Sequence, residues 1–221
     1  MTKLQRTTFE TSRAAEYFDA RQLSTLTGVP TSDFASVCLK ELVDNSLDAC
    51  ETARIRPVVG VKIERNFNLL RLSVSDNGPG IPAEVVRKIL DYNIRVSDKA
   101  AYRSPTRGAQ GNALKTVIGI PYALGSREAL VVEAQGVSHR IQPSIDPAGL
   151  VHFDYAAAEM ILDESGTTVS LEIPVKLKKE AAKIAARNGF PNDHVAQDFH
   201  PLHWVRSFAA FNPHATVSYQ R

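Results

Sequence analysis

The chain has 221 residues, of which 43% are hydrophobic and 23% charged, and its formal net charge is +2 at pH 7. This composition is typical of a soluble globular protein that can bury a core, in one large domain or two small ones. The net charge is too small to indicate nucleic-acid binding by itself.

Sequence features also bear on the compartment. No apolar run approaches the ~18 residues that a membrane-spanning helix needs, and the first twelve residues contain no apolar signal segment. The two cysteines, Cys38 and Cys50, fall on one predicted helix. They would lie about 18 Å apart at ~1.5 Å per residue, which is too far for a disulfide bond. We therefore expect a cytoplasmic protein in a reducing environment, without membrane contact.

The first part of the chain predicts a polar arm, three helices and one hairpin. Residues 1–12 are polar and predict an arm. Helices are predicted over residues 12–23, from a cap at Ser32 or Asp33 to about Ala53, and over residues 82–92. Strands with alternating apolar residues are predicted over 58–65 and 69–76, joined by a turn at 66–68.

The second part predicts more strands and three further helices. Residues 93–112 show little periodicity and predict a long loop. Strands are predicted over residues 128–136, 137–143, 150–156, 166–174 and 215–219. Helices are predicted over residues 113–125, 176–189 and 194–211. Helices that alternate with antiparallel hairpins predict an α+β sandwich of two layers.

The helix that contains "CLKELVDNSLDAC" has two chemically different faces. At ~100° per residue its apolar side chains share one side, and the opposite side carries Glu41, Asp44, Asn45 and Asp48. A solvated polar face is the ordinary interpretation. However, Glu41 and Asn45 are one turn apart, and a carboxylate beside an amide oxygen suits a hard cation and a water molecule.

Three further motifs each have an ordinary alternative. "SVSDNGPGIP" ends a strand in Asp76 and continues with glycines that allow close approach to a flat ring, although Asp-Asn-Gly turns are common. "RGAQGNALK" places glycines before a helix start, where free N–H groups can bind an anion. "SGTTVSLEI" opens a strand on Gly166 and Thr167, and by itself this indicates only a turn before a strand.

Together, in this order, the four motifs resemble those of the GHKL superfamily of ATPases, which have the Bergerat fold. "ELVDNSLDA", "DNGPGI", "GAQGNAL" and "GTTV" are similar to the family's four motifs. Among GHKL proteins, the chain most resembles the ATPase domains of the B-type subunits of topoisomerase VI, including the segment "FAAFNPHATV". The loop ending in Ala113 departs from that pattern and is more similar to MutL and MORC proteins.

The resemblance implies a fold and a site. It implies a mixed, mostly antiparallel sheet with helices on one face and an ATP lid. Glu41 would be the general base, Asn45 would ligate Mg²⁺, and Asp76 would accept a hydrogen bond from the adenine amine. The remaining residues expected at the nucleotide are Gly78, Gly80, Ser97, Lys99, Gly108, Ala109, Gln110, Gly111, Asn112, Ala113, Leu114, Lys115 and Thr167.

The resemblance also implies a function. Residues 1–30 would form an arm and helix that strap a dimer, and residues 31–221 the ATP-binding domain. ATP binding would drive homodimerisation, and the dimer would act as the gate of a type IIB, ATP-dependent DNA topoisomerase. DNA and a cleaving A-type subunit would be the partners in the full assembly. The B-type subunits also carry a transducer lysine that reaches the γ-phosphate, so the resemblance leaves open whether these 221 residues alone support strand passage. A MutL- or MORC-like DNA clamp remains an alternative, whereas a histidine kinase lacks its phospho-acceptor helix here.

Three other features favour ordinary interpretations. His200 and His203 have a possible metal-ligand spacing, but no third ligand is evident. The basic residues of 176–189 could contact DNA phosphates, but a solvated face is the default expectation. Cys38 is expected to be a core residue rather than a nucleophile.

Overall fold

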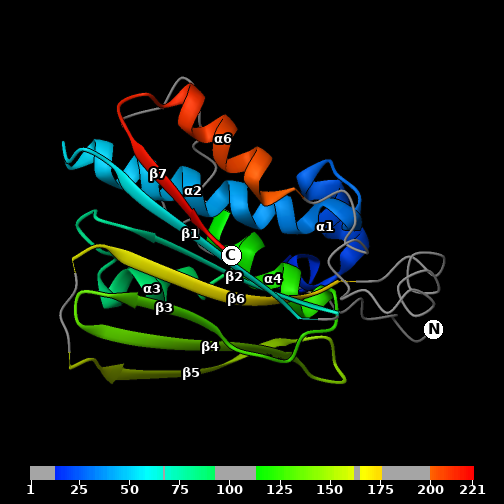
Figure 1. Ribbon diagram of the computed structural model, residues 1–221. Coiled ribbons are helices and arrows are strands. Elements are labelled where there is room, and N and C mark those ends of the chain that lie inside the picture. Colours follow the sequence, from blue (N-terminus) through cyan, green and yellow to red (C-terminus); the bar gives the residue numbers. More distant parts are fainter. Residues whose placement is uncertain (1–12, 67, 93–112, 162–164, 176–199) are drawn as a thin grey trace, which may run out of the picture.

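A seven-stranded sheet forms one layer of the protein (Figure 1). The computed structural model describes residues 13–66, 68–92, 113–161, 165–175 and 200–221. The strand order is β5-β4-β3-β6-β2-β1-β7, in which β1 and β7 pair parallel and all other neighbours pair antiparallel. The strands are β1 (Val58–Asn66), β2 (Leu69–Asp76), β3 (Leu130–Ala134), β4 (Val137–Ile145), β5 (Val151–Glu159), β6 (Thr167–Pro174) and β7 (Thr216–Gln220).

Helices form the second layer. They are α1 (Ala20–Thr27), α2 (Phe34–Thr52), α3 (Ala83–Ile89), α4 (Ala113–Ala123) and α6 (Pro201–Phe211), with short 3₁₀ helices η1 (Arg13–Phe18) and η2 (Thr31–Asp33). In Figure 1, α2, α3 and α4 lie on one face of the sheet, and α6 lies along α2 near β7. The expected α+β sandwich with helices on one face is therefore confirmed.

The core lies between the helices and one face of the sheet. On β6, every second side chain from Thr167 to Ile173 is buried, as the two-residue period of a half-buried strand requires. Leu39 and Leu47 of α2 and Leu70 and Leu72 of β2 are fully buried, so α2 packs its apolar stripe on the centre of the sheet. This packing holds the polar face of α2 in a fixed place relative to the strands.

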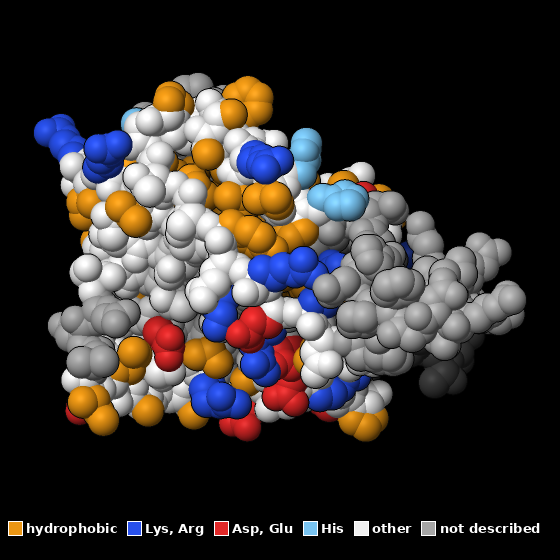
Figure 2. Space-filling model, viewed as in Figure 1, with side chains coloured by type: hydrophobic (Ala, Val, Ile, Leu, Met, Phe, Trp, Pro, Cys, Tyr) orange, Lys and Arg blue, Asp and Glu red, His pale blue; other side chains and the backbone are white. Residues whose placement is uncertain are grey.

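The helix-free face of the sheet is polar. Lys62, Glu64, Arg71 and Glu172 form ion pairs across β1, β2 and β6. Figure 2 shows positive and negative side chains intermixed over this face rather than gathered by sign. Exposed pairs of this kind contribute little to stability, so this face presents charge to solvent without forming a single-sign patch.

The first predicted helix differs from the structure, whereas α2 starts after one of its two predicted caps. The helix expected over residues 12–23 is two elements, because Asp19 breaks it and caps α1 by accepting from the N–H groups of Arg21 and Gln22 at 2.9 Å. At α2, Asp33 occupies the cap position, but within the described chain its side chain makes no capping hydrogen bond. Ser32 donates instead to the Asp33 carboxylate at 3.1 Å, and the turn of η2 leads directly into the helix.

The segment before α2 is part of the core. Phe18 of η1 and Leu23 of α1 are buried. A Cβ atom on Gly119 of α4 would lie 1.8 Å from the carbonyl oxygen of Tyr17, so η1 packs directly on the backbone of α4. The proposed boundary at residue 30 and the strap function of residues 1–30 are not tested by the described residues.

Candidate nucleotide-binding site

The polar face of α2 is less exposed than the sequence pattern indicates. Glu41 and Asn45 are partly exposed, but Asp48 is buried, with 7% of its surface exposed. The ordinary interpretation of a solvated polar face therefore does not hold at Asp48, because α2 is covered on more than its apolar stripe. Lys40 lies 3.3 Å from Glu41 and 2.9 Å from Asp44, so this part of the face does carry the lysine pairing typical of a surface helix.

Asp76 lies at the end of β2, held by two backbone N–H groups. Its Oδ1 atom accepts from Gly78 at 2.8 Å and from Thr167 at 3.2 Å. Burial raises the pKa of Asp76, and hydrogen bonds from Gly78, Ser46 and Thr167 oppose that shift. Ser46 belongs to α2, so the carboxylate lies beside the helix that carries Glu41 and Asn45.

Three glycines allow close packing in the loop after β2 and against Asp76. A Cβ atom on Gly78 would lie 2.9 Å from Asp76 Oδ1 and 3.4 Å from the Cys50 sulfur, and Gly80 has a φ of 78°. At Gly166, with a φ of 99°, a Cβ atom would lie 1.8 Å from the Asp76 carbonyl oxygen. The start of β6 therefore reaches Asp76 only because residue 166 has no side chain.

Asn77 has a structural role that the sequence did not suggest. Its Oδ1 accepts from Val58 N at 2.8 Å and from the Cys50 thiol at 3.3 Å, and its Nδ2 donates to Arg56 O at 3.1 Å. It thus ties the loop after β2 to the end of α2 and the start of β1. The local sequence around Asn77 indicates only a turn, and its partners across the chain leave no local signal.

The glycine-rich loop is only partly described. The proposed phosphate-binding residues Ser97, Lys99, Gly108, Ala109, Gln110, Gly111 and Asn112 lie outside the described residues, whereas Ala113 and Leu114 begin α4. Lys115 is buried, its Nζ donates to Asp91 O at 2.8 Å, and it lies 5.2 Å from the centre of the Tyr92 ring. Burial lowers the pKa of Lys115, and Asp91 opposes that shift.

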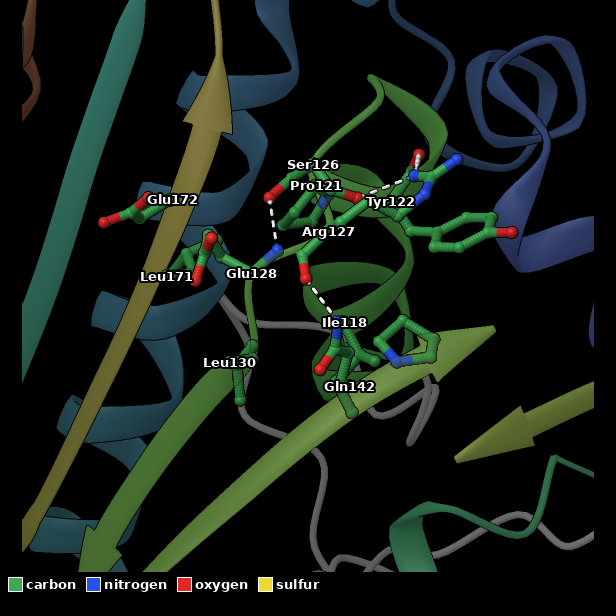
Figure 3. A pocket seen from close by; sticks show the side chains of 11 residues that line it. Ile118, Pro121, Tyr122, Ser126, Arg127, Glu128, Leu130, Gln142, Leu171 and Glu172 are labelled. Atoms are coloured by element: carbon green, nitrogen blue, oxygen red, sulfur yellow. Dashed lines mark hydrogen bonds between the residues drawn. The ribbon is translucent and has the colours of Figure 1, made fainter. Parts of the chain in front are cut away.

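A separate hollow lies at the other end of α4 (Figure 3). Residues of α4, the loop after it, β3, β4 and β6 line about 290 Å³ of space, part of it open to solvent. Arg127 donates to the carbonyl groups of Tyr122 and Ser126 there, and Gln142 donates to Arg127 O. Among the described lining residues are none of those proposed for the nucleotide, so we do not assign this hollow to ATP.

The segment "NPHA", residues 212–215, contacts the end of α2. His214 lies 2.8 Å from Glu51 at the end of α2, and Arg56 donates to His214 O at 3.3 Å. His200 and His203 lie at the start of α6, and in the described part of the chain no three His, Cys, Asp or Glu side chains gather as a metal site. Cys38 and Cys50 are both buried and free, as expected.

No helix within the described ranges is both long and apolar enough to cross a membrane.

The main departures from the pattern inferred for α2 and α4 are three buried polar side chains, those of Ser46, Asp48 and Lys115. The structure brings Asp76, Gly78, Gly80 and Thr167 together beside α2, although Thr167 reaches Asp76 through its backbone N–H.

Comparison with known proteins agrees with this geometry. Residues 31–177 match the family described as histidine kinase-, DNA gyrase B-, and HSP90-like ATPases. Curated archaeal relatives are named as the B subunit of type 2 DNA topoisomerase 6. The chain is 29% identical over 171 residues to that of Natronomonas pharaonis, covering 73% of this chain and 21% of the relative.

Two further relatives extend the similarity. Identity is 30% over 217 residues with the Methanococcoides burtonii protein, covering 92% of this chain and 31% of the relative. It is 25% over 185 residues with the Archaeoglobus fulgidus protein, covering 82% and 28%. The chain thus spans about a third or less of the length of these relatives. The match covers more than half of the chain, from α2 to the end of β6, and the chain belongs to the family of histidine kinase-, DNA gyrase B- and HSP90-like ATPases.

Proposed function

We propose that the chain binds and hydrolyses ATP in a Mg²⁺-dependent reaction, dimerises when ATP is bound, and so gates a type IIB topoisomerase-like DNA machine. The observation that carries the proposal is Asp76. Its carboxylate is partly buried, its Oδ1 accepts from two N–H groups, and a side chain on Gly78 would collide with it. An acceptor held in this way suits the exocyclic amine of adenine, and the glycines let the loop after β2 and the start of β6 pack closely around Asp76.

Glu41 and Asn45 supply the remaining chemistry on α2. Both are partly exposed, and Asn45 directly precedes Ser46, which lies beside Asp76. Glu41 would orient and deprotonate the attacking water. The Asn45 amide oxygen fits a magnesium ion, which is held largely by phosphate oxygens and water. When bound, the ion would neutralise charge that develops on the phosphates.

Residues 108–115 would hold the phosphates through backbone N–H groups, helped by the dipole of α4. Ser97 and Lys99 would add contacts from the same loop. The Lys115 side chain contacts Asp91 O and Tyr92, so we assign Lys115 to the phosphates only through its backbone.

The wider assembly rests on the relatives. The archaeal proteins carry the name of the B subunit of topoisomerase 6, which favours a topoisomerase-like gate over the MutL- or MORC-like clamp. DNA and a cleaving A-type subunit would be the partners of the full assembly, in the cytoplasm. Residues 1–30 would strap two copies together when ATP is bound.

Calorimetric titration with Mg·ADP tests the site. Asp76→Asn replaces the acceptor by an amide of the same shape and is expected to weaken binding at least tenfold. Asp154→Asn, an exposed residue on β5, is the matched control and should bind as the unsubstituted chain does. Equal affinity of the Asp76 variant and the control would overturn the assignment of Asp76.

Two further measurements test catalysis and gating. Glu41→Ala should retain binding and lose phosphate release; retained turnover would remove Glu41 from the reaction. In sedimentation, a dimer that forms only with a non-hydrolysable ATP analogue supports the gate. A monomer that persists at saturating analogue contradicts ATP-driven dimerisation of this chain.

A further inference from the structure

The turn between β3 and β4 contains an unusual residue. Ala134 pairs with Val137, so the turn consists of Gln135 and Gly136 alone, with φ angles of 50° and 74°. Two-residue turns with two positive φ angles favour asparagine, aspartate or glycine at the first position. A glutamine there is held in a left-handed conformation at a cost, which indicates that its side chain has a use.

The Gln135 side chain reaches the loop that follows Asp76. Its Nε2 donates to Pro79 O at 3.1 Å and lies 3.4 Å from Gly80 O. The aliphatic part of the Gln135 side chain also packs on the loop, because a Cβ atom on Gly80 would lie 2.8 Å from Gln135 Cγ. One amide group therefore binds two consecutive carbonyl groups across 56 and 55 residues of sequence.

The same loop is fixed at its other end by Asp76. Gly78 N donates to Asp76 Oδ1 at 2.8 Å, and Gly166, just before β6, packs against the carbonyl oxygen of Asp76. Ala134 pairs with Thr167, so the β3–β4 turn lies beside the start of β6 at this end of the sheet. The loop of residues 76–80 is thus held from both sides by β-strand ends.

We propose that Gln135 is a positioning residue for nucleotide binding: it holds the Pro79 and Gly80 carbonyl groups so that the loop keeps the shape that receives adenine. This rests on the proposed function. Gln135 acts through the loop rather than by touching the nucleotide. The longer side chain explains why glutamine stands where asparagine would suit the turn better, since asparagine is one methylene too short to reach both carbonyls.

Two substitutions separate this role from folding. Gln135→Glu keeps the length but places carboxylate oxygens against two carbonyl oxygens. Gln135→Asn suits the positive φ angle but does not reach the loop. Gln142→Glu is the matched control, because Gln142 also donates its amide to a backbone carbonyl, that of Arg127, from β4.

The expected result is a loss of affinity without loss of the fold. By calorimetry with Mg·ADP, Gln135→Glu should bind about tenfold more weakly and Gln135→Asn about fivefold, as the loss of one or two hydrogen bonds implies. Gln142→Glu should stay within about twofold, and the melting temperature of Gln135→Asn should not fall below that of the unsubstituted chain. Variants at Gln135 that bind within twofold of the Gln142 control overturn the proposal.

Hydrogen exchange gives a readout that needs no nucleotide. The peptide that contains residues 76–81 should exchange faster in Gln135→Glu than in Gln142→Glu, and an equal rate in both overturns the positioning role. Failure of the unsubstituted chain to bind Mg·ADP would instead overturn the proposed function. In that case the exchange rates would still show whether Gln135 holds the loop of residues 76–80. Binding by the unsubstituted chain with unchanged exchange leaves the function standing and removes Gln135 from it.

Discussion

Gly119→Ala should destabilise the protein, although helix propensity alone predicts the opposite. Gly119 lies inside α4, where alanine is favoured over glycine by about 1 kcal/mol. In the folded chain its Cβ atom would lie 1.8 Å from Tyr17 O and 2.9 Å from Tyr17 C. The first distance is roughly 1.5 Å short of van der Waals contact. Because these are backbone atoms, η1 must move as a unit.

The expected magnitude follows from these opposing terms. Overpacking a core contact costs about 1–3 kcal/mol, and more when backbone has to shift. After the gain from propensity, we expect the free energy of unfolding to fall by about 2 kcal/mol. Urea denaturation followed by circular dichroism measures this change. Trypsin should also cleave faster after the exposed Arg21 if η1 and α1 detach from α4.

A second glycine provides the control. Gly60→Ala on β1 places a Cβ atom 2.7 Å from the Ser75 hydroxyl, which can rotate away, so its effect should stay below about 1 kcal/mol. If Gly119→Ala proves as stable as the unsubstituted chain, the close packing of η1 on α4 is refuted, and residues 13–28 are attached less firmly than described.

Three further outcomes are expected. Burial, and next Arg87, lower the pKa of His139 below its ordinary 6.5. The folded state therefore binds fewer protons than the unfolded state, and stability present above pH 6.5 is lost as the pH falls below it. Urea midpoints at about pH 7.5 and 5.5 measure this loss, which should shrink in His139→Gln. Asn77→Ala should lower the free energy of unfolding by about 2–3 kcal/mol, because three partners lose their bonds; a change under about 0.5 kcal/mol in urea denaturation would contradict the tie between α2 and β1. Lys115→Met should lower the melting temperature while Mg·ADP affinity stays within about threefold, since its ammonium contacts Asp91 O; a tenfold loss of affinity would place the side chain on the phosphates.

Much of the fold could be predicted because its signals are local. The alternation of apolar residues predicted β1 and β2 almost to their ends, turn residues marked the start of β6, and the apolar face of residues 34–52 predicted α2. The order of motifs also predicted the family, which residues 31–177 match. Boundaries were less certain, as at Asp19, where one carboxylate binds the N–H groups of Arg21 and Gln22 and starts a new helix.

The sequence by itself determined the layers, the family and the identity of Asp76 as the residue at a strand end, because these depend on periodicity and on motifs within a few residues. Only the tertiary structure decided what surrounds Asp76. Thr167 donates to it across 91 residues, and Gln135 reaches Pro79 across 56. It also decided that Asp48 is buried and that Lys115 points to Asp91. Such contacts form between elements that are distant in the chain, and their free energy depends on packing geometry that no local pattern encodes.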